Sequence, residues 1–296
     1  MQREDRYWQW GSHIILLLIS ISCLIPFVLL VISSITDEQS IIRDGYSFFP
    51  KDISFTAYEY IWEQSSLIFN AYGITILVTV FGTAASLIIT SMLAYPLSRR
   101  DLPGGMFVAF LLFFTLLFNG GLTPTYIIYT QLFDIKNTLA ALLVPGLLMN
   151  GFSVLLMRGF FMTTVPPSVI ESASIDGANE FTIYRKIVLP LSLPILAVVG
   201  LLQGLMYWND WFNGLIYITN PKLYSLQNVM NQLMSNIQFL SSNSNVSSLA
   251  GEAMNQIPTE AFRMVIAVIS IAPIMIAYPF FQKYFVKGLA IGAVKG

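Results

Sequence analysis

Long stretches without an ionisable side chain constrain this chain more than any other feature of its sequence. Only 10% of its 296 residues are charged, whereas an ordinary soluble domain has about 25%. The gaps hold six apolar runs, and each is near the roughly 20 residues that a helix needs to cross the hydrocarbon of a bilayer. The runs are 14–35, 72–97, 106–129, 138–157, 191–218 and 264–281. Because lipid cannot satisfy an exposed backbone, and barrel strands would be shorter and alternating, we expect these runs to be helices.

These runs predict an all-α membrane protein with six transmembrane helices and a single membrane domain over residues 1–296. The first run could be mistaken for a secretory signal peptide. It is longer than the roughly 7–15 apolar residues of a signal-peptide core, and no small-residue cleavage site follows it. We therefore expect it to be retained as a span.

The basic residues are divided unequally between the two sides of the predicted spans. Six spans place both termini on one side, and that side holds Arg3, Arg6, Arg99, Arg100, Arg158, Arg185, Lys186, Lys283, Lys287 and Lys295. The other side holds Arg43, Lys51, Lys136, Lys222 and Arg263, spread over longer loops. The positive-inside rule then predicts a multi-pass plasma-membrane protein with cytoplasmic termini. Its extracellular segments would be 36–70, which is acidic and aromatic, and 220–258, which is polar and holds a surface helix near 224–240.

Several kinds of chemistry are excluded by what the sequence lacks. One cysteine, Cys23, permits no intrachain disulfide, and one histidine, His13, permits no Cys/His zinc cluster or catalytic His network. A net charge of −1 offers no electrostatic surface for nucleic acid. No G-x-x-x-x-G-K-[ST] phosphate-binding loop is present, so ATP cannot bind in the usual P-loop manner. We expect no enzymatic activity, no metal and no cofactor in this chain.

The predicted cytoplasmic loop 159–190 carries the most specific local pattern. Pro166 and Pro167 suit the first turn of a helix, where missing N–H groups cost little. Glu171 lies in the early turns, where a carboxylate suits the helix dipole, and Gly177 can adopt the conformation that ends the helix. A second short amphipathic piece is expected over 179–188. The loop alone is also compatible with an ordinary, well-capped surface helix.

The spacing Glu-x-Ala-x3-Gly-x9-Ile-x-Leu-Pro adds a family resemblance to this loop. It runs without a spacing error through Glu171, Ala173, Gly177, Ile187, Leu189 and Pro190. The pattern resembles the EAA loop of permease subunits in binding-protein-dependent ABC importers, with Ser172 in place of the usual alanine. The segments 208–211, 257–261 and 278–288 resemble carbohydrate-uptake permeases of the maltose-permease-like branch, most closely those for complex oligosaccharides or polysaccharide fragments.

The resemblance implies a type I ABC importer permease fold with a cytoplasmic coupling helix between the fourth and fifth spans. It implies that Glu171 contacts an ATPase subunit and that Gly177 lets the helix dock closely. The coupling set it implies is Glu171, Ser172, Ala173, Asp176, Gly177 and Ala178. The implied partners are a second, different permease, two ATPase subunits that hold ATP and Mg, and an extracellular solute-binding protein. This chain would form half of the pathway for a carbohydrate.

The fifth predicted span holds candidate substrate-path residues. Asp210 is the only charge inside a predicted span, where a carboxylate must face protein or water. Trp208 and Trp211 would share one helix face, and Asn209 and Asn213 another. Aromatic rings stack on sugar C–H faces, and amides and carboxylates bond sugar hydroxyls, so these residues and Tyr207 could line a sugar path. The alternative is an interfacial aromatic belt with helix-packing amides, with Asp210 holding a neighbouring helix or the partner permease.

A polar interruption in the third predicted span supplies one more candidate. The residues Asn119-Gly120-Gly121-Leu122-Thr123-Pro124 should unwind or kink a helix near mid-membrane. Broken helices in transporters often line a cavity, which would place Asn119 on the path. Close helix packing through the small residues is the alternative.

Four other functions fit the sequence less well. A secondary transporter of a small polar solute would need ion-coupling carboxylates in its spans, where only Asp210 stands. A membrane-embedded enzyme would need paired carboxylates, a histidine cluster or an activated nucleophile. A receptor or scaffold would leave the loop pattern unexplained. A permease of the same ABC class for a non-sugar solute stays open.

Overall fold

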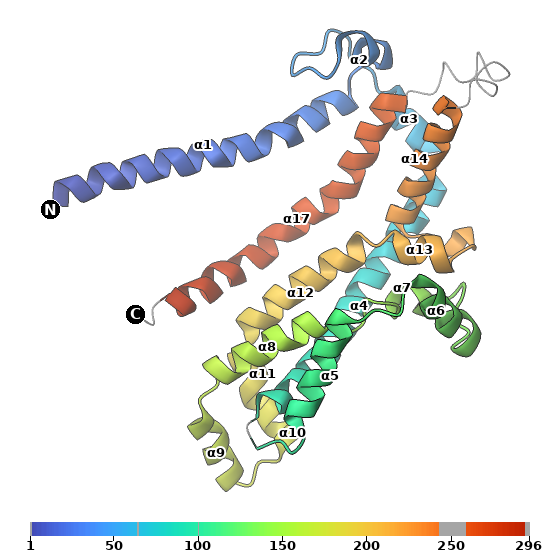
Figure 1. The fold of residues 1–296 in the computed structure, drawn as a ribbon. Helices are drawn as coiled ribbons and strands as arrows, with labels where there is room; N and C mark the ends of the chain where they lie inside the picture. Colours follow the sequence, from blue (N-terminus) through green and yellow to red (C-terminus); the bar gives the residue numbers. More distant parts are fainter. Residues whose placement is uncertain (1, 64, 100, 243–258, 294–296) are drawn as a thin grey trace. The chain divides into compact units, whose positions relative to one another are not determined.

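The computed structural model describes residues 2–63, 65–99, 101–242 and 259–293 (Figure 1). The elements are α1 (Gln2–Ser34), α2 (Glu38–Asp44), α3 (Thr56–Glu63), α4 (Ser65–Ser98), α5 (Gly105–Leu117), α6 (Leu122–Ile127), η1 (Ile128–Leu132), α7 (Ala140–Leu143), α8 (Gly151–Thr164), α9 (Pro167–Ile175), α10 (Glu180–Ile183), η2 (Tyr184–Val188), α11 (Leu189–Leu191), α12 (Leu193–Trp208), α13 (Phe212–Tyr217), η3 (Pro221–Leu223), α14 (Leu226–Ser242) and α17 (Thr259–Ala293). Extended pairing in these residues is limited to an isolated bridge between Thr36 and Ile53. The predicted all-α class is confirmed for the described chain.

The chain divides into two compact units, residues 1–66 with 230–273, and residues 67–229 with 274–296. In the first unit, the carboxylate of Glu38 accepts hydrogen bonds from the backbone N–H groups of Glu260 and Ala261, at 3.0 and 2.9 Å. These N–H groups belong to the first turn of α17 and have no partner within that helix. Glu38 therefore caps α17 and ties it to α2.

In the second unit, α4 and α12 pack closely because small residues lie between them. A Cβ added at Gly82 of α4 would lie 2.5 Å from Cζ of Tyr207, and one added at Gly200 of α12 would lie 3.2 Å from Leu87. Only glycine at position 82 lets the tyrosine ring approach. The helix α8 contacts both α12 and α5 (Figure 1).

Three of the predicted spans correspond to continuous helices and three do not. The ranges 72–97 and 264–281 lie within α4 and α17, and α1 covers 14–35 except for its last residue. The predicted interruption of 106–129 is confirmed, because residues 118–121 separate α5 from α6 and the bend is 113°. By length and composition, two helices in the described part of the chain could cross a membrane alone, and up to five spans result if each bent pair counts as one.

The continuous helix expected over 138–157 and over 191–218 is wrong. Residues 144–150 separate α7 from α8, and residues 209–211 separate α12 from α13. Both ranges are apolar enough for an unbroken helix. In the first range, however, Pro145 and Gly146 form a turn in which Gly146 has φ +70°. The carbonyls of Pro145 and Leu147 in this break, and that of Leu143 at the end of α7, accept hydrogen bonds from side chains.

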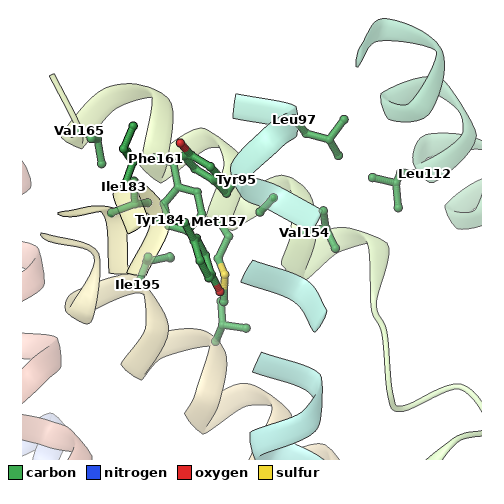
Figure 2. Close-up of a cluster of buried hydrophobic side chains, with 13 residues drawn as sticks. Tyr95, Leu97, Leu112, Val154, Met157, Phe161, Val165, Ile183, Tyr184 and Ile195 are labelled. Atoms are coloured by element: carbon green, nitrogen blue, oxygen red, sulfur yellow. The ribbon is translucent and has the colours of Figure 1, made fainter. Parts of the chain in front are cut away.

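The second unit has a hydrophobic core at each end of its long helices. The inner core joins α4, α8, η2 and α12, and it includes Tyr95, Met157, Phe161, Ile183 and Tyr184 (Figure 2). The outer core joins α4, α7 and α13 around Val78, Leu142, Tyr207 and Tyr217. Because the inner core contains residues on both sides of α9, it positions that short helix.

Candidate functional site

The helix α9 begins and ends where the sequence predicts. Pro167 occupies its first turn after an extended Pro166, and Gly177 has φ +81° just after its C-terminal cap. The N–H of Ala178 donates to the carbonyl of Ala173 at 3.0 Å, and the N–H of Gly177 donates to the carbonyl of Ser174 at 3.1 Å. This pair of bonds is the Schellman motif, and it gives α9 a rigid end.

The predicted coupling residues separate onto two faces of α9. Ala173 and Ala178 are partly buried and pack against the inner core together with Ile170. Glu171, Ser172 and Asp176 are exposed, as is Gly177 in the turn. The coupling set therefore consists of an outward polar face and an inward face of small residues.

Apolar side chains are exposed beside this polar face. Ile175 is 86% exposed, and Phe181, just beyond the turn, is 61% exposed. A cavity of about 380 Å³ adjoins α9 and is lined by Glu171, Pro167 and Ile170 together with Arg99 and Tyr95 of the α4 end. Exposed apolar groups rimmed by polar ones are typical of a protein interaction surface.

A polar cluster that the sequence analysis missed lies immediately beyond α9. The hydroxyl of Tyr95 donates to Oε2 of Glu180 at 2.5 Å, and Nη2 of Arg99 lies 3.5 Å from Oε1 of Glu180. The guanidinium of Arg99 also donates through Nε and Nη2 to Asp101, at 3.0 and 2.9 Å. The hydrogen bonds from Arg99 lower the pKa of Asp101 to about 2, and they raise the pKa of Arg99. No local sequence signal links residues so far apart in the chain.

The interruption at 144–150 is closed by side chains of the 203–213 segment. The hydroxyl of Tyr207 donates to the carbonyl of Leu143 at 2.8 Å. The amide of Asn213 donates to the carbonyl of Pro145 at 3.0 Å, and the amide of Gln203 donates to the carbonyl of Leu147 at 2.6 Å. Three carbonyls at the break thus receive three side-chain donors. Tyr207 and Asn213, both predicted on the substrate path, are buried and make these internal bonds.

The faces predicted for the fifth span are wrong because α12 ends at Trp208. Trp208 is only 7% exposed, with its ring 6.4 Å from that of Tyr72, whereas Trp211 is 44% exposed. Asn209 is exposed and donates to the carbonyl of Leu205. Oδ1 of Asp210 accepts from the N–H of Asn213 at 3.2 Å, which caps the start of α13. The structure brings Asn209 and Trp211 to the surface and leaves Trp208 inside.

The interruption at 118–121 is open. All four of its residues are exposed, and Oδ1 of Asn119 accepts from the N–H of Gly121 at 2.8 Å. A Cβ added at Gly120 would meet only Pro124, at 4.0 Å, and one added at Gly121 would meet nothing within 4 Å. Within the described chain, no helix packs closely on these glycines. The structure therefore does not support the alternative of close packing through small residues.

The described residues contain no group of three or more His, Cys, Asp or Glu side chains that could hold a metal ion. The candidate site thus consists of the exposed face of α9 with its neighbouring polar cluster, and of two interruptions in apolar helices, one closed and one open.

Comparison with known proteins places these features in context. Residues 103–291 match the family described as "Binding-protein-dependent transport system inner membrane component". The chain is 33% identical to the Polygalacturonan/rhamnogalacturonan transport system permease protein YtcP of Bacillus subtilis (strain 168), over 99% of this chain and 100% of that one. It is 34% identical to Protein LplC of the same organism, over 92% of this chain and 90% of that one.

A solved structure is also similar to this chain. It is the crystal structure of a bacterial ABC transporter involved in the import of the acidic polysaccharide alginate. One of its chains matches with a TM-score of 0.77 and 30% identity, over 96% of this chain and 98% of that one.

Proposed function

Because the chain belongs to the family of inner membrane components of binding-protein-dependent transport systems, we propose that it forms half of the pathway through which an ABC importer takes up an oligosaccharide. The substrate class is supported by a relative named for polygalacturonan and rhamnogalacturonan and by the alginate importer. As a permease subunit the chain is not itself an enzyme. In this proposal ATP and Mg are bound by two separate ATPase subunits.

The observation that carries the coupling role is the exposed outer face of α9. Glu171, Ser172 and Asp176 present polar groups there, and Ile175 presents an apolar one. In the proposal these residues contact an ATPase subunit. Ala173 and Ala178 keep α9 close to the inner core, and the turn at Gly177 returns the chain to the bundle.

The proposed topology has six spans and cytoplasmic termini. The spans are α1, α4, α5 with α6, α7 with α8, α12 with α13, and α17. The unequal distribution of lysine and arginine supports this orientation. The loop that holds α9 then lies in the cytoplasm, where an ATPase subunit can reach it.

The proposed partners are a second permease chain, the two ATPase subunits and an extracellular solute-binding protein. A single permease leaves the interruption at 118–121 exposed. Backbone of this kind within hydrocarbon must be covered by protein or lie along water. A second permease supplies that cover and the other wall of the pathway, and segments 36–70 and 220–258 would face the binding protein.

Within this pathway, the exposed polar and aromatic residues at the interruptions are the candidates for sugar contact. They are Asn119 at 118–121 and Asn209 and Trp211 at 209–211. Trp208, Asp210, Tyr207 and Asn213 support the shape of the site from within the chain. This division follows from burial and from the hydrogen bonds that each side chain already makes.

The coupling role is tested by reversing the charge at Glu171 in the reconstituted importer. Glu171→Lys should abolish ATP-driven uptake and weaken copurification of the ATPase subunits, because a cation replaces an exposed carboxylate at the contact. Glu63→Lys, at the exposed end of α3, is the matched control and should leave ATPase binding unchanged. Equal uptake by Glu171→Lys and the native chain would reject the role of α9.

The substrate class is tested in the same vesicles with labelled solutes. Acidic oligosaccharides, neutral oligosaccharides and a non-sugar solute are compared at equal concentration with the cognate binding protein. Uptake of an oligosaccharide that depends on ATP supports the proposal. Uptake of the non-sugar solute alone would make the chain a permease of the same class for another cargo.

A further inference from the structure

The two chain segments that flank α9 are both bonded to the same end of α4. Before α9, Nε of Arg158 in α8 donates to the carbonyl of Leu97 at 2.8 Å. After α9, Glu180 accepts from the hydroxyl of Tyr95 at 2.5 Å. A movement of α9 therefore acts on the last turns of α4 from both sides.

The connection from α9 to Glu180 is short and has little freedom. Gly177 and Ala178 are held by the Schellman bonds described above. Oδ1 of Asn179 then accepts from the N–H of Thr182 at 2.8 Å, which caps the helix that Glu180 begins. The position of Glu180 is thus defined relative to the end of α9.

The partners of Glu180 on the α4 side are also held in place. Tyr95 is only 7% exposed, and its ring lies 5.6 Å from the ring of Tyr184 (Figure 2). The hydroxyl of Tyr184 lies 2.7 Å from the hydroxyl of Ser91 in α4. Arg99 is oriented by its two bonds to Asp101. Glu180 therefore contacts two side chains, Tyr95 and Arg99, that are each also held by other residues.

The carboxylate of Glu180 itself lies at a cavity and is not enclosed by packed side chains. Cavities of about 410 and 380 Å³ both have Tyr95, Arg99 and Asp101 in their walls, and Glu180 lines the larger one. The side chain of Glu180 is 62% exposed, against 22% for Arg99. The inner core already packs Ile183 and Tyr184 of this segment against α4, and the bonds of Glu180 add a polar contact that fixes the first turn of α10 to Tyr95 and Arg99.

We propose that Glu180, held by Tyr95 and Arg99, is a positioning residue that fixes α9 to α4, so that ATPase movement at α9 reaches the pathway. These three residues are the α4 clamp. The inference rests on the proposed function, since it needs an ATPase at α9. The uninterrupted α4 extends about 50 Å at 1.5 Å per residue. Toward its other end, Gly82 packs against the ring of Tyr207, and the hydroxyl oxygen of Thr75 accepts a hydrogen bond from the N–H of Leu226.

The test compares Glu180→Ala with the native chain in the complete importer reconstituted in vesicles. Solute transported per ATP hydrolysed is measured, and docking is measured separately by cross-linking to the ATPase subunit through Ser172→Cys. Glu180→Ala should cross-link normally while transport per ATP falls on the order of tenfold, a typical coupling between linked sites. Glu180→Gln keeps an acceptor for Tyr95 and should retain most of the ratio. Lys186→Ala, an exposed cation of η2 outside the clamp, is the control.

A double-mutant cycle with Tyr95→Phe tests whether Glu180 acts through that hydroxyl. Tyr95→Phe alone should lower transport per ATP, and it should add little in the Glu180→Ala background. Additive losses would overturn the clamp, and so would a lower thermal stability of Glu180→Ala with unchanged transport per ATP. Absence of both cross-linking and ATP-driven uptake in a chain that carries Ser172→Cys as its sole change would instead reject the proposed function on which the clamp rests.

Discussion

The interruptions at 144–150 and 118–121 both divide a predicted span, but they differ in how their backbone is satisfied. At 144–150 the carbonyls of Leu143, Pro145 and Leu147 each receive a side-chain donor from the 203–213 segment. At 118–121 every residue is exposed, and Asn119 bonds only within the turn. Three carbonyls at the first break are satisfied within the chain, and in the proposed membrane setting the second break needs a partner or water.

In the proposed function, this difference separates polar residues that support the structure from those that contact the sugar. A buried amide or hydroxyl opposite a free carbonyl stabilises the break, because an unsatisfied backbone group in an apolar environment is costly. An exposed amide at an open break has hydrogen-bonding capacity left for a solute. We therefore assign the proposed pathway residues by the state of the neighbouring backbone and not by the presence of polar residues in a span alone.

The largest expected effect is at the contact that supports Tyr207. Gly82→Ala places a Cβ 2.5 Å from Cζ of a ring whose hydroxyl is bonded to Leu143. Overpacking of this kind costs about 1–3 kcal/mol or more. Gly73→Ala on the same helix has nothing within 4 Å of its new Cβ and should be neutral or stabilising. Thermal unfolding in detergent measures both, and equal stability would show that Tyr207 can leave the closed break.

The next effect distinguishes two adjacent glycines at the open break. Gly121 has φ +84° and ψ 175°, a conformation nearly restricted to glycine, so Gly121→Ala should cost about 1–3 kcal/mol. Gly120→Ala has a Cβ with no contact closer than 4.0 Å and should cost much less. The same unfolding assay compares them. A larger loss for Gly120→Ala would mean that this chain packs on the break after all.

A smaller loss is expected when a donor to the closed break is removed. Gln203→Leu keeps the size of the side chain but leaves the carbonyl of Leu147 without its donor at 2.6 Å. We expect a loss of about 1–2 kcal/mol, with transport at permissive temperature retained. Asn209→Leu, whose amide bonds only within α12, serves as the stability control. A stable Gln203→Leu protein that no longer transports would place Gln203 on the pathway instead.

The smallest expected change in stability, together with a large change in transport, is at Asn119 in the open break. Asn119→Ala at the exposed open break should change the free energy of unfolding by less than about 1 kcal/mol but lower oligosaccharide uptake. Tyr207→Phe should show the opposite balance, because its hydroxyl bonds Leu143 inside the chain. Uptake and unfolding are measured on both variants. Normal uptake by Asn119→Ala would remove the open break from the sugar path.

The sequence predicted features that depend on neighbouring residues. The charge-free gaps located the long helices α1, α4 and α17, and the proline and glycine signals located both ends of α9. The Gly-Gly pair located the break at 118–121. Each of these signals acts over a few residues, so a pattern along the chain contains the information.

The features that the sequence did not predict depend on contacts between distant segments. Pro145 and Gly146 were a local signal for the second break, but a continuous apolar run concealed it. The roles of Tyr207 and Asn213 depend on carbonyls 64 and 68 residues away. Glu180 meets Tyr95 across 85 residues. A period or a spacing along one segment cannot show which of these side chains is already bonded.

The continuity of α4 also limits how its length can change. Each residue inserted into a helix rotates everything beyond it by about 100°. Thr75, Gly82, Ser91 and Tyr95 all contact other segments from this one helix, so a single insertion between them would turn one group of contacts away from its partners. The interrupted segments can absorb an added residue in a loop. In this protein the helical register of α4 therefore determines which way its contact residues face, and so where the neighbouring segments can pack.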